Sequence, residues 1–475
     1  MANGTKLLKD TLLYSVANFG SKILVFLMLP LYTHYFTTAE YGLWDIVVTT
    51  ATLLAPFITF ELVAAVYRWL LEENAKAAKQ SIITSGAVTI LRNLLIFNVL
   101  TVFLFVFISV PYGWEALAFI DVSVFTSFMQ QCARGLGFNK LFALIGIVQT
   151  AITVTLNLIF ILILDLRLEA FFYSAIIAGI CVVVMAWIAM GFGRYLSLKA
   201  YSKKLVKSFL VYSIPIIPGA ASWWVMTMSD RYFITIFLGM DDNGIYAIAN
   251  KIPAVLLMVS SVFSLAWKDS AIVEFESADK NEYYSKVFRH FFRLMTTAVI
   301  CLTLLTKPVL ALFIAGDFYS SWKYIGILLL ATLVSSFSQF WGAGYHGARK
   351  TNLIFVSSLV GAIVNVLVNL LLIQYIGLYA VAISTFLAFL VMWLMRVYFA
   401  GSYFTIRINY RDMLILLPVM AAAIIVPFIF DWVGIAISIC LGILLFFMYN
   451  WRMMMLVFQN MKEMVVRRLG KANRG

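Results

Sequence analysis

Charged residues are scarce in this chain. They make up 12% of its 475 residues, against about 25% in an average soluble domain. By contrast, 63% of the residues are hydrophobic and the mean hydropathy is +0.96. A transmembrane helix needs about 20 apolar residues, and apolar runs of that length follow one another along the whole chain with only short polar breaks. We therefore expect a polytopic membrane protein without a separate soluble domain.

Cysteines and catalytic motifs are also sparse. The four cysteines, Cys132, Cys181, Cys301 and Cys440, are far apart and lie mostly in apolar runs, and no CxxC or Cys/His spacing suggests a metal or redox pair. Gly-rich phosphate loops and the HExxH and GxSxG patterns are missing. The outer loops are too short to hold the catalytic groups of a membrane polymerase or glycosyltransferase. The sequence therefore indicates neither an enzyme nor a metal or cofactor site.

The apolar runs predict an all-α protein with about fourteen transmembrane helices. The first run is preceded by Lys6 and Lys9 but continues past Lys22 to Phe36 without a small-residue cleavage site, so we interpret it as a span rather than a signal peptide. The expected spans are 8–36, 41–70, 81–110, 114–136, 140–164, 169–193, 207–239, 243–273, 284–314, 320–346, 352–375, 377–400, 411–430 and 433–457.

Positive charge exceeds negative charge, and its distribution matters more than its sum. The formal net charge is +13, which in a soluble protein would suggest nucleic-acid binding. The positive residues gather in alternate loops and the tail: Lys76, Lys79, Arg134, Lys140, Arg194, Lys199, Lys203, Lys204, Lys207, Lys280, Lys286, Arg289, Arg349, Lys350, Arg407, Arg411, Lys462, Arg467, Arg468, Lys471 and Arg474. The opposite loops hold little beyond Arg167 and Lys323. The positive-inside rule therefore predicts that both termini are cytoplasmic, and no nucleic-acid partner is needed.

The two halves of the chain share short sequence matches in the same order. Residues 6–15 match residues 204–213 at the Lys, Leu, Lys, Leu, Tyr and Ser positions. Downstream, the segment starting at Gly42 (GLWDI) matches the one starting at Gly244 (GIYAI), and the segment starting at Asn157 (NLIFI) matches the one starting at Asn369 (NLLLI). Three matches in one order favour a duplicated unit of six spans. Because six is even, both copies enter the membrane from the same side and the repeat is parallel.

This duplication predicts the domain organisation. We expect an N-lobe at 1–194 with the first six spans, a basic cytoplasmic linker at 195–208, a C-lobe at 209–400 with the next six spans, and two further spans with a basic cytoplasmic tail at 401–475. In transporters built from repeats the substrate site lies between the lobes, and their rocking gives alternating access. The sequence therefore predicts two six-helix lobes around a central cavity.

Several cations fall inside apolar runs, where each is costly unless it faces a polar interior. Lys22 shares a helical face with polar residues of the first span, while Arg231 and Lys251 lie deep in the seventh and eighth spans. We expect them to line a cationic cavity, because a diphosphate needs several charge-assisted donors once its hydration is lost. Arg68, nearer an inner end, is a further candidate. The alternative for each is a structural ion pair or a side chain that reaches the interface.

Acidic residues and prolines in the same runs give two more predictions. The candidates for ion coupling are Asp45, Glu61, Asp230 and Asp269. A buried carboxylate can carry a coupling proton, although structural pairing is the alternative for each. Pro215, Pro218 and Pro253 interrupt helices, because proline lacks a backbone donor and clashes with the preceding turn. We expect hinges or kinks at these prolines.

The stretch from Pro215 to Trp267 carries a recognisable pattern. It consists of Pro215-x-x-Pro218, Trp224, Asp230-Arg231, Gly239, Gly244-x-Tyr246-x-x-Ala249-x-Lys251-Ile252-Pro253 and Phe263-x-x-Ala266-Trp267. After the first span comes Glu40-Tyr41-Gly42-Leu43-Trp44. Together these residues resemble the polysaccharide-transport branch of the multidrug/oligosaccharidyl-lipid/polysaccharide exporter superfamily, which includes the Wzx-type O-antigen flippases. The resemblance covers nearly the whole chain.

The resemblance implies a two-lobe protein of the bacterial inner membrane. Such a protein moves undecaprenyl-diphosphate-linked oligosaccharide, the repeat unit of O-antigen or another surface polysaccharide, from the cytoplasmic to the outer leaflet, and so serves lipopolysaccharide or related biosynthesis. The family's central cavity is cationic, and the matching positions here are Lys22, Arg231 and Lys251. The implied partners are the lipid-linked oligosaccharide, membrane lipids, a polysaccharide polymerase and a chain-length regulator. No cofactor is implied.

Two other functions stay open. The first is an ion-coupled exporter of drugs or other small molecules with the same fold, which the excess of interior cations disfavours. The second is a membrane glycan polymerase or ligase, which the short loops disfavour. A lipid II flippase is weakened as an interpretation, because the fuller set of cavity arginines in those relatives is not evident here.

Overall fold

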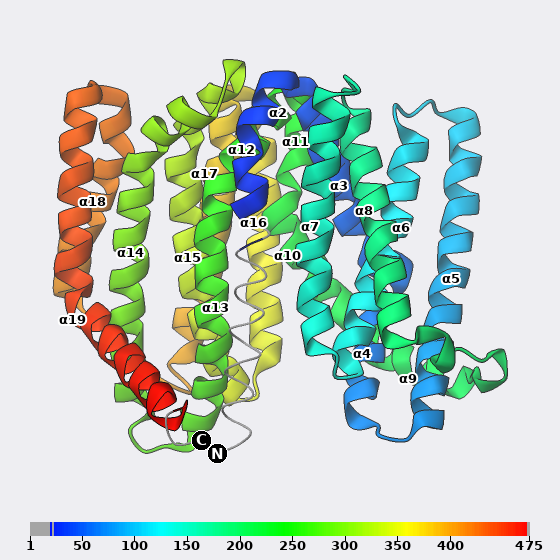
Figure 1. Cartoon of the computed structure of the whole chain (residues 1–475). Coiled ribbons are helices and arrows are strands. Elements are labelled where there is room, and N and C mark those ends of the chain that lie inside the picture. The colour runs from blue at the N-terminus through cyan, green and yellow to red at the C-terminus, as the bar shows by residue number, and fades with distance from the viewer. Residues whose placement is uncertain (1–19, 21–22, 473–475) are drawn as a thin grey trace. The chain divides into compact units, whose positions relative to one another are not determined.

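The structure is a computed structural model in which every described regular element is a helix (Figure 1). It describes residue 20 and residues 23–472, and for residues 452–454 and 456–472 it describes the backbone alone. The all-α fold class is confirmed. Lys22 and most of the first expected span before it lie outside the described residues.

The first part of the chain forms long helices joined by short turns. Its helices are α2 (Leu29–Tyr35), α3 (Thr38–Thr59), α4 (Leu62–Glu72), α5 (Lys76–Phe107), α6 (Gly113–Gly135), α7 (Asn139–Leu162), α8 (Glu169–Met190), α9 (Lys203–Ser213), α10 (Ile217–Met228), α11 (Asp230–Phe237) and α12 (Met240–Ala249), with short 3-10 helices η1 (Phe192–Tyr195), η2 (Leu198–Ala200) and η3 (Ile214–Ile216). The expected seventh span is thus built from several helical pieces.

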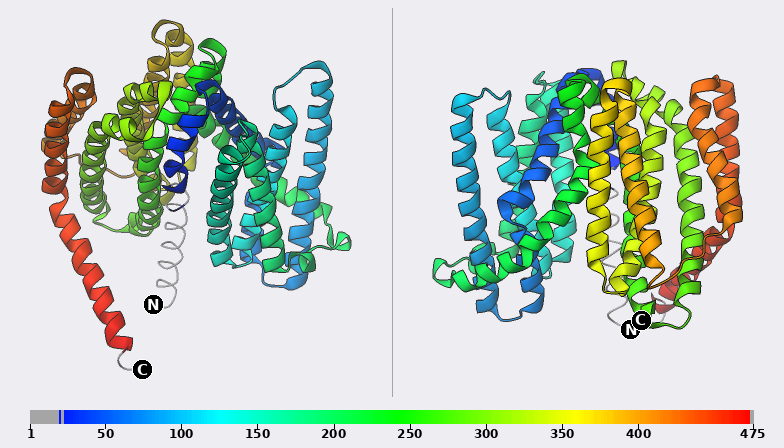
Figure 2. Two further views of the ribbon diagram at one scale, coloured as in Figure 1. Left: turned by 45° about the horizontal axis from the view of Figure 1, so that its top comes forward. Right: turned by 180° about the vertical axis from the view of Figure 1, so that it is seen from behind.

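The second part has longer, less interrupted helices. These are α13 (Lys251–Val273), α14 (Lys280–Phe313), α15 (Trp322–Gly347), α16 (Thr351–Ile376), α17 (Leu378–Ala400), α18 (Tyr410–Ile429) and α19 (Trp432–Ala472), with 3-10 helices η4 (Glu274–Glu276) and η5 (Gly316–Ser321). Within this part α18 and α19 lie beside α14 (Figure 2).

Among the described residues, 13 helices are long and apolar enough to cross a membrane. They coincide with the second to the fourteenth spans expected from the sequence. The shorter apolar helix Ile23–Tyr35 falls on the described part of the first expected span. The prediction of a multi-pass membrane protein is therefore confirmed.

Contacts between residues divide the chain into two compact units. The first contains the residues up to Ala247 together with Ile314–Phe318, and the second contains Ile248–Phe313 and Tyr319 onward. The first unit thus includes α9, α10, α11 and most of α12. The lobe boundary expected at 195–208 rests on the sequence repeat and stays a prediction.

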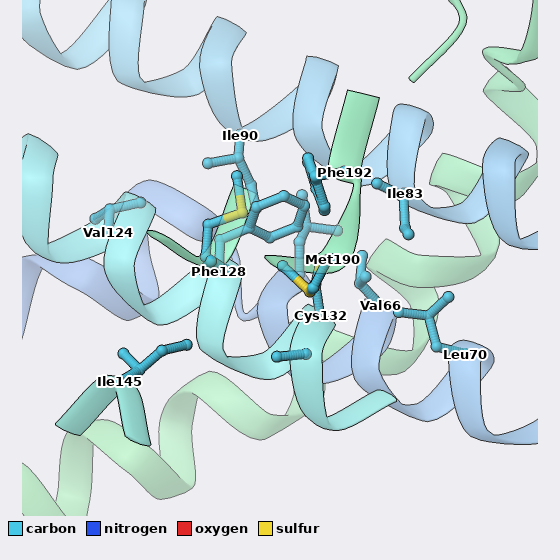
Figure 3. Packing of buried hydrophobic residues seen from close by; sticks show 14 of the residues in the cluster. Val66, Leu70, Ile83, Ile90, Val124, Phe128, Cys132, Ile145, Met190 and Phe192 are labelled. Atoms are coloured by element: carbon cyan, nitrogen blue, oxygen red, sulfur yellow. The ribbon is translucent and has the colours of Figure 1, made fainter. Parts of the chain in front are cut away.

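The first unit is held together by an apolar core on α4, α5, α6 and α8. Val66 of α4 and Ile83 of α5 are fully buried against Phe128 and Cys132 of α6 (Figure 3). Phe192, just after α8, closes the same cluster. Because such cores lose several kcal/mol when a large side chain is truncated, this cluster gives the polar residues described below a rigid support.

The second unit packs around α15. Of the 13 candidate spans, the one that contains α15 has the largest share of residues buried inside the protein, 83%. α15 packs against α13 and α17. Trp267 of α13 stacks on Phe340, with 4.3 Å between the ring centroids. Its indole N–H donates a hydrogen bond to the Phe340 carbonyl at 2.9 Å. A buried tryptophan normally needs such a partner for its N–H.

The second span is broken rather than continuous. Phe60 and Glu61, between α3 and α4, both adopt left-handed backbone conformations, with φ of 49° and 53°. Pro56 precedes this break inside α3. Ser213 donates a hydrogen bond to the Phe60 carbonyl at 2.6 Å, and Asn93 donates one to the Ile58 carbonyl at 3.0 Å. These bonds satisfy carbonyls that the interrupted helix leaves without partners, as a membrane interior requires.

Candidate functional site

A buried ion pair joins α3 to α11 inside the first unit. Arg231 Nε lies 3.3 Å from Asp45 Oδ2, and the two side chains are 7% and 16% exposed. Arg231 Nη1 also donates to the Thr227 carbonyl at 2.8 Å, and the guanidinium lies 5.3 Å from the centre of the Tyr246 ring. A charge this deep needs both an opposite charge and hydrogen bonds to be tolerated, and Arg231 has both.

Asp230, the neighbour of Arg231, takes part in the same polar cluster. The Tyr246 hydroxyl of α12 donates a hydrogen bond to Asp230 Oδ2 at 2.9 Å, and Asp230 is 1% exposed. The cluster of Asp45, Thr227, Asp230, Arg231 and Tyr246 therefore draws on four helices. We call it the α3–α11 charge cluster.

The local structure of α3 directs Asp45 towards this cluster. α3 begins with a capping box, in which Thr37 accepts a hydrogen bond from the Glu40 amide and Glu40 accepts one from the Thr37 amide. Asp45, Thr49 and Thr52 follow four- and three-residue spacing and so share one helical face. Trp224 of α10 donates to the Thr49 carbonyl and the Thr52 hydroxyl, both at 3.3 Å. One face of α3 thus bonds to both α10 and α11.

Further polar contacts join α3 to α11 and α12. The hydroxyls of Thr50 and Tyr232 lie 2.6 Å apart. Near the start of α3, Asn243 Nδ2 donates to the Gly42 carbonyl at 2.7 Å, and the Thr38 hydroxyl donates to Asp241. Hydrogen bonds and an ion pair therefore join α3 to α10, α11 and α12 along much of its length, in addition to apolar packing.

A second polar feature of the first unit is a cavity of about 480 Å³ between α3, α4 and α6. Its polar lining consists of Thr52, Thr59, Glu61, Tyr67, Ser123, Ser127, Gln131 and Arg134. Glu61 reaches it from the break between α3 and α4. No hydrogen bond or ion pair joins its carboxylate to a residue that the structure describes. Arg134 lies over the Tyr67 ring at 4.7 Å. We call this space the Glu61 cavity.

The structure distributes the cations expected from the sequence over different places. Lys22 lies outside the described residues. Arg231 is in the α3–α11 charge cluster, whereas Lys251 is the first residue of α13 in the second unit. The Arg68 side chain is 50% exposed, pairs with Glu72 at 3.2 Å and lies 4.6 Å from the Tyr212 ring centre. Their role in binding substrate stays a prediction.

The acidic candidates and the prolines are also spread out. Asp45 and Asp230 belong to the charge cluster, Glu61 faces its own cavity, and Asp269 is exposed on α13 in the second unit. Pro215 and Pro218 flank the step from η3 to α10, and Pro253 lies in the first turn of α13. All three prolines are therefore at helix junctions, and their hinge role stays a prediction. In the part of the chain that is described, no group of three His, Cys, Asp or Glu side chains could hold a metal ion.

Two cations of the second unit, the buried Arg396 and the half-buried Lys307, were missed by the sequence reasoning. Arg396 of α17 is 4% exposed and donates to the Ser338 carbonyl at 2.8 Å and to the Ser357 hydroxyl at 2.9 Å. Lys307 of α14 donates to the Pro427 carbonyl at 2.7 Å. Both lie inside apolar runs. Because a charge in the membrane is costly, their positions in the sequence could have identified them as candidates.

Asp121 of α6 was missed as well. It sits in an apolar run and accepts a hydrogen bond from Asn98 Nδ2 of α5 at 2.9 Å. The same cost of a charge in the membrane could have singled it out.

Comparison with known proteins places these features in a family. Residues 7–267 match the family model described as polysaccharide biosynthesis protein. The chain is 22% identical over 250 residues to the probable low-salt glycan biosynthesis flippase of Haloferax volcanii. That alignment covers 51% of this chain and 52% of the relative, so it spans about half of the relative's length.

Two solved structures show how the chain is folded. The lipid II flippase MurJ in an inward closed conformation is 15% identical, and the match covers 94% of this chain and 100% of that one with a TM-score of 0.65. An inward-facing multidrug resistance MATE transporter of the MOP superfamily is also 15% identical, with 82% of this chain and 95% of that one covered and a TM-score of 0.65. At this identity the likeness concerns the fold alone. Because the family model spans more than half of the chain, the protein belongs to the polysaccharide biosynthesis protein family, the polysaccharide-transport branch that its sequence resembles.

Proposed function

We propose that the protein is a flippase that moves undecaprenyl-diphosphate-linked oligosaccharide from the cytoplasmic to the outer leaflet of a bacterial inner membrane. The cargo is the repeat unit of O-antigen or of another surface polysaccharide, and transport proceeds by alternating access coupled to an ion. The family match over residues 7–267 carries this proposal. Both termini face the cytoplasm in this scheme, as the distribution of positive residues suggests.

Arg231 supports a role in binding the diphosphate. A guanidinium binds phosphate oxygens through paired donors, and Arg231 is already held in a buried position by Asp45 at 3.3 Å. In our proposal the diphosphate takes the place of the Asp45 carboxylate during transport, so that the buried cation always has an anionic partner. Lys22, Lys251 and Arg68 supply the further positive charge that a diphosphate needs.

The Glu61 cavity supports a role for sugars or ions. Its lining of hydroxyls, an amide and a carboxylate offers many hydrogen-bond partners, as a carbohydrate requires. No hydrogen bond or ion pair joins Glu61 or Asp269 to a described residue, whereas Asp45 and Asp230 are bonded within the charge cluster. Of the two, Glu61 lines a cavity and Asp269 is exposed. We therefore favour Glu61 for the coupling ion, with Asp269 as the remaining candidate.

An ion-coupled exporter of small molecules is the second candidate function. It is favoured by one observation, the TM-score of 0.65 with a multidrug transporter, which equals the value for the lipid II flippase. The fold therefore fits either function. A glycan polymerase or ligase is the less favoured alternative, because the turns between the described spans are short.

Reconstitution separates the three functions. Purified protein in liposomes is given lipid-linked oligosaccharide, and both its exposure in the opposite leaflet and its glycan chain length are measured. We expect translocation at unchanged chain length. Longer glycans without translocation would indicate a polymerase, and drug efflux without lipid translocation would indicate an exporter.

The cationic residues are tested in the same assay. Lys22→Ala and Lys251→Ala are each expected to abolish translocation while the protein still purifies as a folded species. Lys323→Ala, a change at an exposed position in the first turn of α15, is the charge-matched control and keeps the wild-type rate. Normal translocation by both interior variants would show that the cavity assignment is wrong. If the protein acts in a biosynthetic complex, we expect the polysaccharide polymerase and chain-length regulator to co-purify with it.

A further inference from the structure

Asn98 of α5 and Asp121 of α6 form an isolated polar pair in the first unit. Asn98 Nδ2 donates to Asp121 Oδ2 at 2.9 Å. The other oxygen of each group, Asn98 Oδ1 and Asp121 Oδ1, is buried and has no hydrogen-bond partner. These two oxygens lie next to the bonded atoms, because each shares a carbon with one of them.

The two unpartnered oxygens create a conflict if Asp121 is ionised. A carboxylate and an amide oxygen are both acceptors only, so neither can satisfy the other. A buried acceptor without a donor costs about 1–3 kcal/mol, and a buried charge that is not paired costs more. A single proton on Asp121 Oδ1 removes the conflict, because the acid then donates to Asn98 Oδ1 while Asn98 Nδ2 donates back.

Charged groups of the neighbouring helices do not compensate Asp121. The helices that pack against α6 are α3, α4, α5, α7 and α8. Asp45 of α3 pairs with Arg231, Arg68 of α4 with Glu72, and Glu169 of α8 accepts from Tyr112. Arg92 of α5 donates to Asn93, and Lys140 of α7 lies in the first turn of that helix. No ion pair joins any of these groups, or any other described residue, to Asp121.

Asp121 does not line the Glu61 cavity. The cavity is lined from α6 by Phe119, Ser123, Val124, Ser127, Gln131 and Arg134. Asp121 instead meets α5, whose neighbouring side chains Leu95 and Val99 are exposed on the apolar outer surface. The pair therefore lies in an apolar wall of the unit rather than in its polar cavity.

We propose that Asp121 and Asn98 form a proton-binding site, in which Asp121 Oδ1 carries a proton and donates a hydrogen bond to Asn98 Oδ1. The resulting acid–amide pair joins α5 to α6 through two hydrogen bonds. Loss of the proton leaves a carboxylate with one neutral donor in an apolar wall, so the packing of α5 on α6 depends on proton occupancy. The site stands independently of the transported substrate.

Infrared spectroscopy of the protein in lipid nanodiscs tests the proposal directly. A protonated carboxylic acid gives a C=O stretching band that a carboxylate lacks and that shifts in D2O. We expect this band near neutral pH in the wild type and its loss in Asp121→Asn. Glu115→Gln, which removes a carboxyl from the first turn of the same helix, is the matched control and keeps the band. A spectrum that Asp121→Asn leaves unchanged would overturn the proposal.

The pH dependence of stability is the second readout. The amide of Asp121→Asn mimics the protonated acid and keeps both hydrogen bonds to Asn98, so this variant is expected to fold. Thermal unfolding of the protein in nanodiscs is measured at several pH values. The midpoint of unfolding of the wild type is expected to fall as the pH rises. The part of this fall that comes from Asp121 should be absent in Asp121→Asn and present in Glu115→Gln. An equal dependence on pH in Asp121→Asn and the wild type would count against the site.

Discussion

Gly42 of α3 and Gly244 of α12 meet at a helix crossing that leaves no room for a side chain on either residue. A Cβ atom on Gly42 would overlap the Met240 carbonyl oxygen and lie 2.9 Å from the Gly244 nitrogen. A Cβ atom on Gly244 would overlap the Thr38 carbonyl oxygen. Gly42 and Gly244 begin the short matching segments GLWDI and GIYAI, so these two segments contact each other through their backbones.

Alanine at either glycine is expected to destabilise the protein. Both added methyl groups would meet backbone, which cannot rotate away, so the helices must separate. Overpacking of this kind costs about 1–3 kcal/mol. Thermal unfolding of Gly42→Ala and Gly244→Ala in detergent measures the effect.

Gly146→Ala is the control for these variants. Gly146 lies inside α7, and a Cβ there would meet no atom within 4 Å. Alanine favours a helix over glycine by about 0.5–1 kcal/mol, so this variant is expected to match or exceed the wild type. A similar loss in all three variants would mean that the close crossing of α3 and α12 has no special role.

The spans could be predicted from the sequence because they depend on local patterns. Long apolar runs determine where helices lie in a membrane, and 13 of the expected spans coincide with described helices. The meeting of Gly42 with Gly244 could not be predicted. It depends on how two helices cross whose glycines are 202 residues apart in the chain, and the sequence match says nothing about a contact between them.

The partners of the polar side chains could not be predicted from the sequence either. Arg231 was expected to line a cavity, with a structural ion pair as the alternative, and the sequence did not identify Asp45 of α3 as the partner in its salt bridge. The break at Phe60 and Glu61 was missed because neither is a glycine or a proline, and the left-handed backbone is held by Ser213 and Asn93 from other helices. Local propensity carries no information about such distant donors.

The Asp45–Arg231 pair yields a prediction about stability. Asp45→Leu removes the carboxylate that pairs with the buried guanidinium, a change that typically costs about 3–5 kcal/mol, and Arg231→Met is the second single change. Asp45→Leu combined with Arg231→Met removes both charges and is expected to lose much less than the sum of the single changes. A double-mutant cycle by thermal unfolding measures this coupling.

The Glu40–Arg167 ion pair is exposed and serves as a control for the buried Asp45–Arg231 pair. Arg167 Nη2 lies 2.9 Å from Glu40 Oε2, but the arginine side chain is 56% exposed. Exposed pairs contribute about 0–1 kcal/mol, so Arg167→Ala should change stability little. Additive losses at Asp45 and Arg231 would show that the buried pair does not couple these helices.

Arg396 should not tolerate replacement by lysine. Its guanidinium donates to Ser338 on α15 and to Ser357 and Ser358 on α16, and a lysine ammonium cannot reproduce this planar fork. Each acceptor left buried without a donor costs about 1–3 kcal/mol. We expect Arg396→Lys to lower the midpoint of unfolding, whereas Arg407→Lys, at an exposed loop position, leaves it unchanged. Equal stability of the two variants would contradict the role of Arg396 in joining three helices.

Asp242, in the first turn of α12 before the expected eighth span, gives a prediction about pH. Burial, followed by the nearby Asp241 carboxylate, raises the pKa of Asp242 above its ordinary value. A raised pKa means that folding favours the protonated acid. The wild type therefore has its full stability below the unfolded-state pKa and loses part of it as pH rises through the folded-state pKa.

Asp242→Asn removes this loss, because the neutral amide stays uncharged at every pH. Since the site is only partly buried, we expect a gain below about 1 kcal/mol, present at neutral pH and absent at strongly acidic pH. Thermal unfolding of both proteins at the two pH values measures the difference. Asp279→Asn, which removes one negative charge from an exposed position, controls for the change in net charge. A gain that is the same at both pH values would show that the effect does not come from the ionisation of Asp242.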